Sequence, residues 1–274
     1  KQAKKRSLRV VNEHFEPVFN NASATQVVFQ QSGKRGDMTT IQRLPVEAGL
    51  DAERQLLDRV HAGALDCGLL FWRPLNAALV MPRRLGRLDG FAAAQAACAA
   101  QGWPVALRDT GGEPVPQSSA VLNVALAYAV QASDDEQKRI ETAYLRLCEP
   151  LRAWLRGLGL DPGLGEVDGA FCDGRYNVTL EQRKLAGTAQ RWRRRPSDGR
   201  HVCLAHAAVL LENQRQSMVE VVNSFYAGCD LPSRCRVASH VALDELLEDV
   251  WPATDSLLDC YRQQLQTAGF TLSS

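Results

Sequence analysis

The segment that most constrains this chain is Lys184-Leu-Ala-Gly-Thr-Ala-Gln190, a predicted strand in which a lysine precedes small residues. A glycine inside a strand weakens it unless something must approach the backbone closely, and Gly187 occupies such a position. A strand face that met only water would not need Ala186, Gly187 and Ala189 beside the lysine. The simplest chemical interpretation is a pocket for an extended acyl chain, with the Lys184 cation near its carbonyl end.

A second candidate residue, Cys172, lies on the N-terminal side of Lys184 and directly before the turn signal Asp173-Gly174. Cysteines are more often core residues than nucleophiles, but a nearby ammonium favours the thiolate, which is the reactive form. A predicted hairpin that turns at Leu180-Glu181 places Asn177 opposite Lys184. In that geometry Cys172 reaches Lys184 only if the bend at Asp173-Gly174 folds it back.

Composition excludes several functional classes. The 274 residues are 45% hydrophobic and 23% charged with a net charge of +1, so the overall field favours neither nucleic acid nor an anionic membrane. We find no apolar run near the ~20 residues that a membrane helix needs, and the basic N-terminus lacks the apolar core of a secretory signal. The eight cysteines form no Cys-x-x-Cys pair and no zinc spacing. We therefore expect reduced thiols, no metal site and a cytoplasmic location.

The order of predicted elements indicates one domain over 41–274, preceded by a polar segment 1–40 that is either an irregular arm or a poorly specified strand. The interleaved elements predict an α/β fold of the α+β type, with a mixed sheet flanked by helices and a helical C-terminal portion. Helices are expected at 47–62, 91–100, from a capping box at Ser133 to about Gly157, and at 213–227, 243–249 and 253–268. Strands are expected at 67–72, 77–81, 104–108, 166–172, 175–180, 183–194 and 201–211.

Three further features have both an ordinary and a functional interpretation. Thr110-Gly111-Gly112, between a predicted strand and an apolar helical run over 120–130, is either a tight turn or a loop against which a ligand lies. It is neither a Rossmann fingerprint nor a P-loop. His206 lies in an apolar strand, where a hydrogen-bonded core histidine is the more common case. The run Arg191-Trp-Arg-Arg-Arg195 is most simply a solvated sheet edge or hairpin tip, and its functional interpretation is a docking surface for an acidic partner protein.

Together these motifs resemble the catalytic domain shared by lipoate-protein ligases, octanoyltransferases and biotin-protein ligases, over about residues 45–270. The matching motifs occur in the same order as in that family: Leu70-Phe-Trp-Arg-Pro74, Arg108-Asp-Thr-Gly-Gly112, Leu122-Asn123, Lys184-Leu-Ala-Gly-Thr-Ala-Gln-Arg191 and His206-Ala-Ala-Val-Leu210. The resemblance implies a mixed, largely antiparallel sheet flanked by helices. The segment Gly169–Asn177 looks most like the cysteine-dependent amidotransferases of that family.

The resemblance also implies roles for individual residues. Cys172 would be the nucleophile that forms an acyl thioester, and Lys184 would orient the acyl carbonyl and assist proton transfer. The residues expected around the acyl group are Arg108, Thr110, Gly111, Gly112, Asn123, Gly187, Thr188, Ala189 and His206. The implied activity transfers an octanoyl or lipoyl group to the lysine of a lipoyl domain or a glycine cleavage H protein. Acyl carrier protein is a possible donor, and no cofactor is needed.

Departures from the family's pattern leave two alternatives open. ATP-dependent ligases carry Gly-Arg-Asn-Asp where this chain has Gly174-Arg-Tyr-Asn177. A neutral amide is a poor Mg²⁺ ligand, which weakens the ATP- and magnesium-dependent ligase alternative. Leu107, Glu113 and Gln117 replace a second arginine, a third glycine or arginine, and a histidine. An acid beside the acyl site motivates the other alternative, a non-catalytic paralogue that binds lipoyl domains or lipoate.

Overall fold

The computed structural model describes residues 25–29, 41–131, 134–232 and 235–273, and its main element is a mixed sheet. The strand order is β12-β1-β3-β7-β11-β10-β9-β8, and β2 pairs with β3 beside that path. Strands β1, β2 and β12 join by parallel pairing, whereas β3, β7, β11, β10, β9 and β8 form an antiparallel series. The strands are β1 (Thr25–Phe29), β2 (Gln42–Leu44), β3 (Cys67–Pro74), β7 (Val121–Ala129), β8 (Pro162–Leu164), β9 (Val178–Leu180), β10 (Arg183–Arg194), β11 (His201–Leu210) and β12 (Phe270–Ser273).

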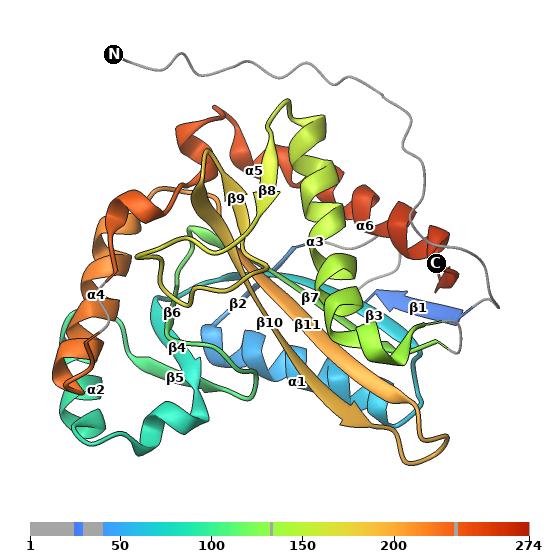
Figure 1. Ribbon diagram of the computed structural model, residues 1–274, viewed down its shortest axis with the longest axis horizontal. Coiled ribbons are helices and arrows are strands. Elements are labelled where there is room, and N and C mark those ends of the chain that lie inside the picture. Colours follow the sequence, from blue (N-terminus) through green and yellow to red (C-terminus); the bar gives the residue numbers. More distant parts are fainter. Residues whose placement is uncertain (1–24, 30–40, 132–133, 233–234, 274) are drawn as a thin grey trace.

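Helices cover both faces of the large sheet (Figure 1). Helix α1 (Val46–His61) packs on the face that carries Leu70 and Trp72. Helices α3 (Arg139–Gly157) and α6 (Asp255–Thr267) belong to the core on the face of Leu69 and Phe71, with the short α5 (Val250–Ala253) before α6. Because both faces are buried, the central strands are almost continuously apolar in sequence.

A second, three-stranded sheet of order β5-β4-β6 stands beside the large one. It consists of β4 (Ala78–Pro82), β5 (Val105–Arg108) and β6 (Val115–Gln117). Helices α2 (Phe91–Ala100) and α4 (Arg215–Gly228) lie side by side and complete the core around this sheet (Figure 1). The observed architecture confirms the predicted mixed, largely antiparallel sheet with flanking helices.

Several predicted elements match closely, among them 47–62 as α1, 91–100 as α2 and 213–227 as α4. The helical prediction for 120–130 is wrong, since this run forms the central strand β7. Periodicity cannot separate a helix from a strand that is buried on both faces. In the predicted helix 243–249 only the single 3₁₀ turn Leu243–Glu245 forms. Ser133 lies outside the described residues, as does most of 1–40, within which β1 forms.

The predicted strand 166–172 is also wrong: this segment belongs to a loop of successive turns between β8 and β9. The following hairpin turns at Glu181 and Gln182, which both have positive φ, rather than at Leu180-Glu181. The register therefore places Thr179 opposite Lys184, not Asn177. None of the helices in the described ranges is long and apolar enough to cross a membrane. All eight cysteines are described and carry free thiols.

Close packing of α1 on the sheet yields a first prediction. A Cβ added at Gly49 would lie 2.4 Å from the ring of Trp72, which is fully buried and cannot move aside. We expect Gly49→Ala to lower the free energy of unfolding by about 2 kcal/mol, because overpacking outweighs the gain of about 1 kcal/mol in helix propensity.

Urea denaturation measures this effect, and Gly157→Ala at the end of α3 is the matched control. A Cβ at Gly157 meets no atom within 4 Å, so this substitution should be neutral or stabilising by up to about 1 kcal/mol. Equal effects of the two substitutions would contradict the packing argument.

Candidate functional site

A pocket of about 430 Å³, measured with its open mouth, lies between the α1 face of the large sheet and the small sheet. Its floor follows the strand register: Gly187, Ala208, Asn123 and Trp72 lie opposite one another on β10, β11, β7 and β3. Residues directly opposite in a sheet point to the same face. The lining comprises Leu50, Glu53, Trp72, Val80, Arg108, Val115, Gln117, Asn123, Cys172, Gly187, Thr188, Ala189, His206 and Ala208.

Lys184 is buried beside this pocket, with 3% of its surface exposed. Its Nζ donates to the carbonyl oxygens of Phe171 at 2.6 Å and Cys172 at 2.7 Å. A register shift between Lys184 and Ala186 marks a bulge, a feature that re-aims a side chain. A Cβ at Gly187 would lie 3.0 Å from Nζ, so this glycine makes room for the lysine. Burial lowers the pKa of the Lys184 ammonium.

The loop before β9 presents Cys172 to the same place. One oxygen of Asp173, Oδ1, accepts from Val167 N at 2.8 Å, Gly174 N at 2.9 Å and Asn177 Nδ2 at 2.7 Å. Cys172 itself has φ of 50°, a left-handed conformation that costs about 1–3 kcal/mol for a residue other than glycine. The predicted bend at Asp173-Gly174 therefore folds Cys172 back, and its carbonyl meets Lys184.

The double-glycine loop packs against the Cys172 thiol. Glu113 N donates to Cys172 Sγ at 3.2 Å. Gly112 has φ of 99°, and a Cβ there would lie 2.7 Å from Sγ and 3.0 Å from Arg108 Nη2. Gly112 is thus required for this close approach, whereas a Cβ at Gly111 meets nothing within 4 Å. Neither glycine is among the lining residues of the pocket.

Arg108, at the end of β5, holds the double-glycine loop in place. Its guanidinium donates to the carbonyl oxygens of Val80 at 3.0 Å, Gly111 at 2.9 Å and Glu113 at 2.9 Å. Only 6% of Arg108 is exposed, and burial lowers its pKa, an effect that the adjacent Cys172 partly offsets. An arginine nevertheless keeps its proton in proteins, so a fixed cation stands beside the thiol.

A chain of buried polar side chains lines another wall of the pocket, and its first member, Glu53, is not among the site residues predicted from the sequence. Trp72 Nε1 donates to Glu53 Oε1 at 2.9 Å, and the other carboxylate oxygen lies 2.8 Å from His206 Nδ1. His206 Nε2 lies 3.0 Å from Thr110 Oγ1. His206 is thus a hydrogen-bonded histidine at the pocket wall. The signal for Glu53 was available: it interrupts the apolar stripe of α1 between Leu50 and Leu57.

His240, the second residue that was missed, connects the two reactive segments. Its Nε2 accepts from Phe171 N at 3.1 Å and its Nδ1 lies 3.0 Å from Arg236 O, while its ring stacks on that of Phe171 at 4.1 Å. The next residue, Val241, donates its N–H to Lys184 O at 2.9 Å. No local sequence pattern identifies such a residue.

The remaining predicted residues occupy definite places. Asn123 Nδ2 donates to Gln117 Oε1 at 2.9 Å on the pocket wall. Thr188 Oγ1 donates to Tyr176 O at 3.0 Å and so holds the cysteine loop to β10. Ala189 lies opposite His206. Glu113, the acid that departs from the family's pattern, pairs through its side chain with Arg84 at 2.6 Å, so only its backbone N–H contacts the thiol.

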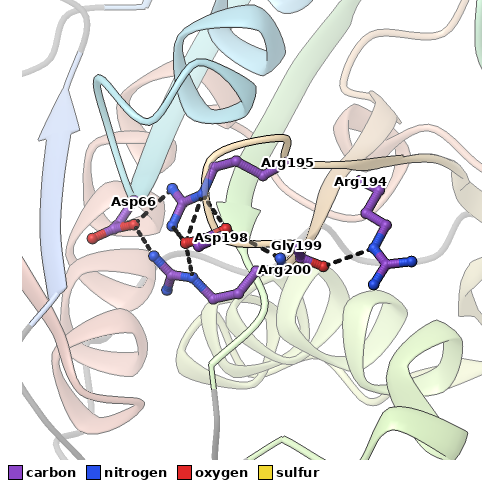
Figure 2. A network of polar contacts seen from close by, with 6 residues as sticks. All are labelled: Asp66, Arg194, Arg195, Asp198, Gly199 and Arg200. Carbon is purple, nitrogen blue, oxygen red and sulfur yellow. Dashed lines mark hydrogen bonds and ion pairs between the residues drawn. The ribbon is translucent and has the colours of Figure 1, made fainter.

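The basic run 191–195 lies at the end of β10, where the hairpin leads into β11, but it is not the solvated surface that its simpler interpretation predicted, since only Arg194 is exposed. Arg195 is buried and pairs with Asp66 and Asp198, which also hold Arg200 (Figure 2). Arg194 donates to Gly199 O at 3.1 Å in the same turn. The remaining arginines pair with Asp109 and Asp58. Acidic partners within the protein thus account for Arg191, Arg193 and Arg195, whereas Arg194 is exposed and pairs only with a carbonyl oxygen. A single exposed cation weakens the docking interpretation.

His240 generates a prediction about acid stability. Burial, together with the charge of Lys184, lowers the pKa of His240 from 6.5 to about 3. Between these pH values the histidine is protonated in the unfolded chain and neutral in the folded protein. Stability from this group is complete above pH 6.5 and is lost as pH falls. Wild type should lose about 3 kcal/mol more than His240→Gln between pH 7 and pH 4.

Urea denaturation at both pH values tests this difference. Glutamine can still accept from Phe171 N–H but does not titrate, which makes it the matched replacement. Parallel stability curves for the two proteins would contradict the assignment of a neutral, buried His240.

Comparison with known proteins agrees with the geometry. A family model described as the lipoyl protein ligase A/B catalytic domain matches residues 45–256. An uncharacterised protein of Cupriavidus necator is 40% identical over 191 residues, which are 66% of this chain and 74% of that protein. The octanoyl-[GcvH]:protein N-octanoyltransferase of Kyrpidia tusciae is 30% identical over 148 residues, or 52% of this chain; the match spans about half of that relative, 50% of its length.

Solved structures share the fold at low identity. Lipoate-protein ligase A bound with ATP aligns with a TM-score of 0.56 at 16% identity, over 92% of this chain and 88% of that one. A bipartite lipoate protein ligase of Thermoplasma acidophilum aligns with a TM-score of 0.57 at 14% identity, over 92% and 87%. The family model covers most of the described chain, including both reactive segments. The chain therefore belongs to the lipoyl protein ligase A/B catalytic domain family.

Proposed function

We propose that this protein is a cytoplasmic acyltransferase of lipoate metabolism that moves an octanoyl or lipoyl group through a thioester on Cys172. The acceptor is the lysine of a lipoyl domain or of a glycine cleavage H protein. One observation supports this most: Cys172 and Lys184 come from separate segments, yet Lys184 Nζ lies 2.7 Å from the Cys172 carbonyl oxygen beside the pocket. The Kyrpidia tusciae relative is named for an octanoyl transfer between proteins.

In the first half-reaction the Cys172 thiolate attacks the carbonyl carbon of the donor, and the carbonyl electron pair moves to oxygen. Arg108, which interacts with the Cys172 side chain, and the Glu113 N–H, which donates to Sγ, stabilise the thiolate and the negative charge that forms. The bond between the carbonyl carbon and the donor's leaving atom then breaks. The Lys184 ammonium gives that atom a proton, and Cys172 holds the acyl group as a thioester.

In the second half-reaction the acceptor lysine amine attacks the thioester carbon. Lys184, now neutral, takes the proton that the new amide releases, and Sγ leaves as the thiolate. The lowered pKa of Lys184 suits this exchange, because burial brings the neutral amine within easier reach than in an exposed lysine. With a thioester donor the transfer is downhill without ATP, whereas with an amide-linked donor it is nearly neutral.

The ligase alternative finds less support in the residues of the cysteine loop. The loop carboxylate nearest to the family's magnesium motif, Asp173, uses Oδ1 to accept three N–H groups. Asn177, where ligases carry an aspartate, donates its amide to that same oxygen and is buried. These contacts give both side chains a role in shaping the Cys172 loop. The binder alternative weakens as well, since the Glu113 carboxylate points to Arg84 rather than to the thiol.

The transferase proposal predicts that Cys172→Ser lowers octanoyl transfer to a lipoyl domain by at least about 1,000-fold while the protein stays folded. The assay uses octanoyl-acyl carrier protein without ATP. Cys260→Ser, at a half-buried cysteine of α6, is the matched control and should keep full activity. Unchanged turnover in Cys172→Ser would rule out the thioester mechanism, and transfer that appears only with free lipoate, ATP and magnesium would favour the ligase.

Lys184 gives a prediction with a defined sign. Its pKa is below the ordinary 10.5 in the folded protein, so between the two values the unfolded chain holds more protons. Stability should therefore rise with pH through this window in wild type, reaching its full value above about 10.5. Lys184→Met, which cannot titrate, should lack the rise and should lose both half-reactions.

Denaturation of both proteins from pH 7 to pH 10 measures the effect. A rise of equal size in Lys184→Met would show that another group carries it. Unfolding of Lys184→Met at every pH would identify Lys184 as a structural residue and contradict its assignment to the reaction.

A further inference from the structure

Two buried amide side chains in the pocket wall each use only one end of the amide group in a hydrogen bond. Gln117 and Asn123 are 5% and 4% exposed and both line the pocket. Asn123 Nδ2 donates to Gln117 Oε1, and this is the single side-chain hydrogen bond that either makes among the described residues. Gln117 Nε2 and Asn123 Oδ1 therefore have no hydrogen-bond partner among the residues that the structure describes. Exchanging the amide ends changes nothing, since one donor group and one acceptor remain free either way.

This pair lies at a definite distance from the reacting atoms. Asn123 is in register with Ala208, which is in register with Gly187, and Lys184 Nζ stands over Gly187. Two strand spacings are about 10 Å. An extended chain with bonds of about 1.5 Å advances about 1.25 Å per bond because it zigzags, so a chain of about nine atoms covers that distance. The distal end of a medium-length acyl chain thus reaches the amide pair when its carbonyl is at Cys172.

A plain hydrocarbon end is a poor match for this place. It would displace water from the free amide ends and offer them no hydrogen bond, and buried polar groups without partners are costly. A hydroxyl group both donates and accepts, so it satisfies Asn123 Oδ1 and Gln117 Nε2 together. The polar atoms of Glu53 and His206 on the same wall are already paired with each other and with Trp72 and Thr110.

We propose that Gln117 and Asn123 form a specificity site for a medium-chain acyl group with a hydrogen-bonding hydroxyl near its distal end, in preference to a plain octanoyl group. The inference rests on the proposed function for the placement of the carbonyl at Cys172. It adds a substrate class that octanoyl or lipoyl transfer does not include. Gln117, where the family has a histidine, becomes a determinant of this preference.

The test compares octanoyl and 8-hydroxyoctanoyl thioesters of N-acetylcysteamine, with the rate of Cys172 acylation followed by intact-protein mass spectrometry. Wild type should prefer the hydroxylated chain by about tenfold in kcat/KM. Gln117→Met and Asn123→Leu, which keep the side-chain size, should abolish the preference. Gln137→Met, on an exposed turn, is the matched control and should retain it. A wild-type preference for octanoyl, or an unchanged ratio in Gln117→Met, would overturn the proposal.

Wild type alone supplies a second measurement, in case the variants do not fold. A 3-hydroxyoctanoyl thioester places its hydroxyl near the carbonyl and should show no preference over octanoyl. Equal preference for 3-hydroxy and 8-hydroxy chains would contradict the distal placement.

Failure of the acyl transfer itself is distinguished by binding. In Cys172→Ala, calorimetric titration with the two free acids should still favour 8-hydroxyoctanoate by about tenfold, whether or not a thioester ever forms. Equal affinities there would overturn the specificity site and leave the transferase proposal standing.

Discussion

The buried Lys184 ammonium is the interaction on which this site depends. Removing the ammonium from water costs free energy, and its hydrogen bonds to the carbonyl oxygens of Phe171 and Cys172 offset that cost. Those two bonds hold the cysteine loop against β10, and Gly187 provides the space that the lysine occupies. The same burial that makes the charge costly lowers its pKa, so one arrangement accounts for both the loop geometry and the proton chemistry we propose.

The surrounding contacts share one property: each fixes a group that would otherwise be free to move. His240 holds Phe171 N–H, Arg108 holds the double-glycine loop through three carbonyl oxygens, and Glu53 orients His206. Cys172 is held in a strained, left-handed backbone conformation. Strain of this kind persists only where neighbouring contacts over-determine the geometry, and it is common at functional sites.

Much of this arrangement could be predicted from the sequence, because several site residues lie in distinctive local sequence patterns. A lysine followed by small residues indicated Lys184 and Gly187, and the turn signal after Cys172 indicated a bend. Other parts have no local trace. His240 reaches Phe171 from sixty-nine positions away along the chain, a contact that only the tertiary fold creates.

The central strand β7 was misassigned as helical because burial on both faces removes its alternation of apolar and polar residues. The hairpin register was wrong because the turn residues Glu181 and Gln182 adopt positive φ without glycine.

The central claim is that Cys172 carries the acyl group, and peptide mapping tests it most directly. The protein is incubated with octanoyl-acyl carrier protein in the absence of ATP, digested at low pH and analysed by mass spectrometry before and after hydroxylamine. We expect an octanoyl adduct on the peptide that contains Cys172, removed by hydroxylamine as a thioester should be. An adduct on another cysteine, or none on Cys172 while a lipoyl domain in the same mixture becomes octanoylated, would contradict it.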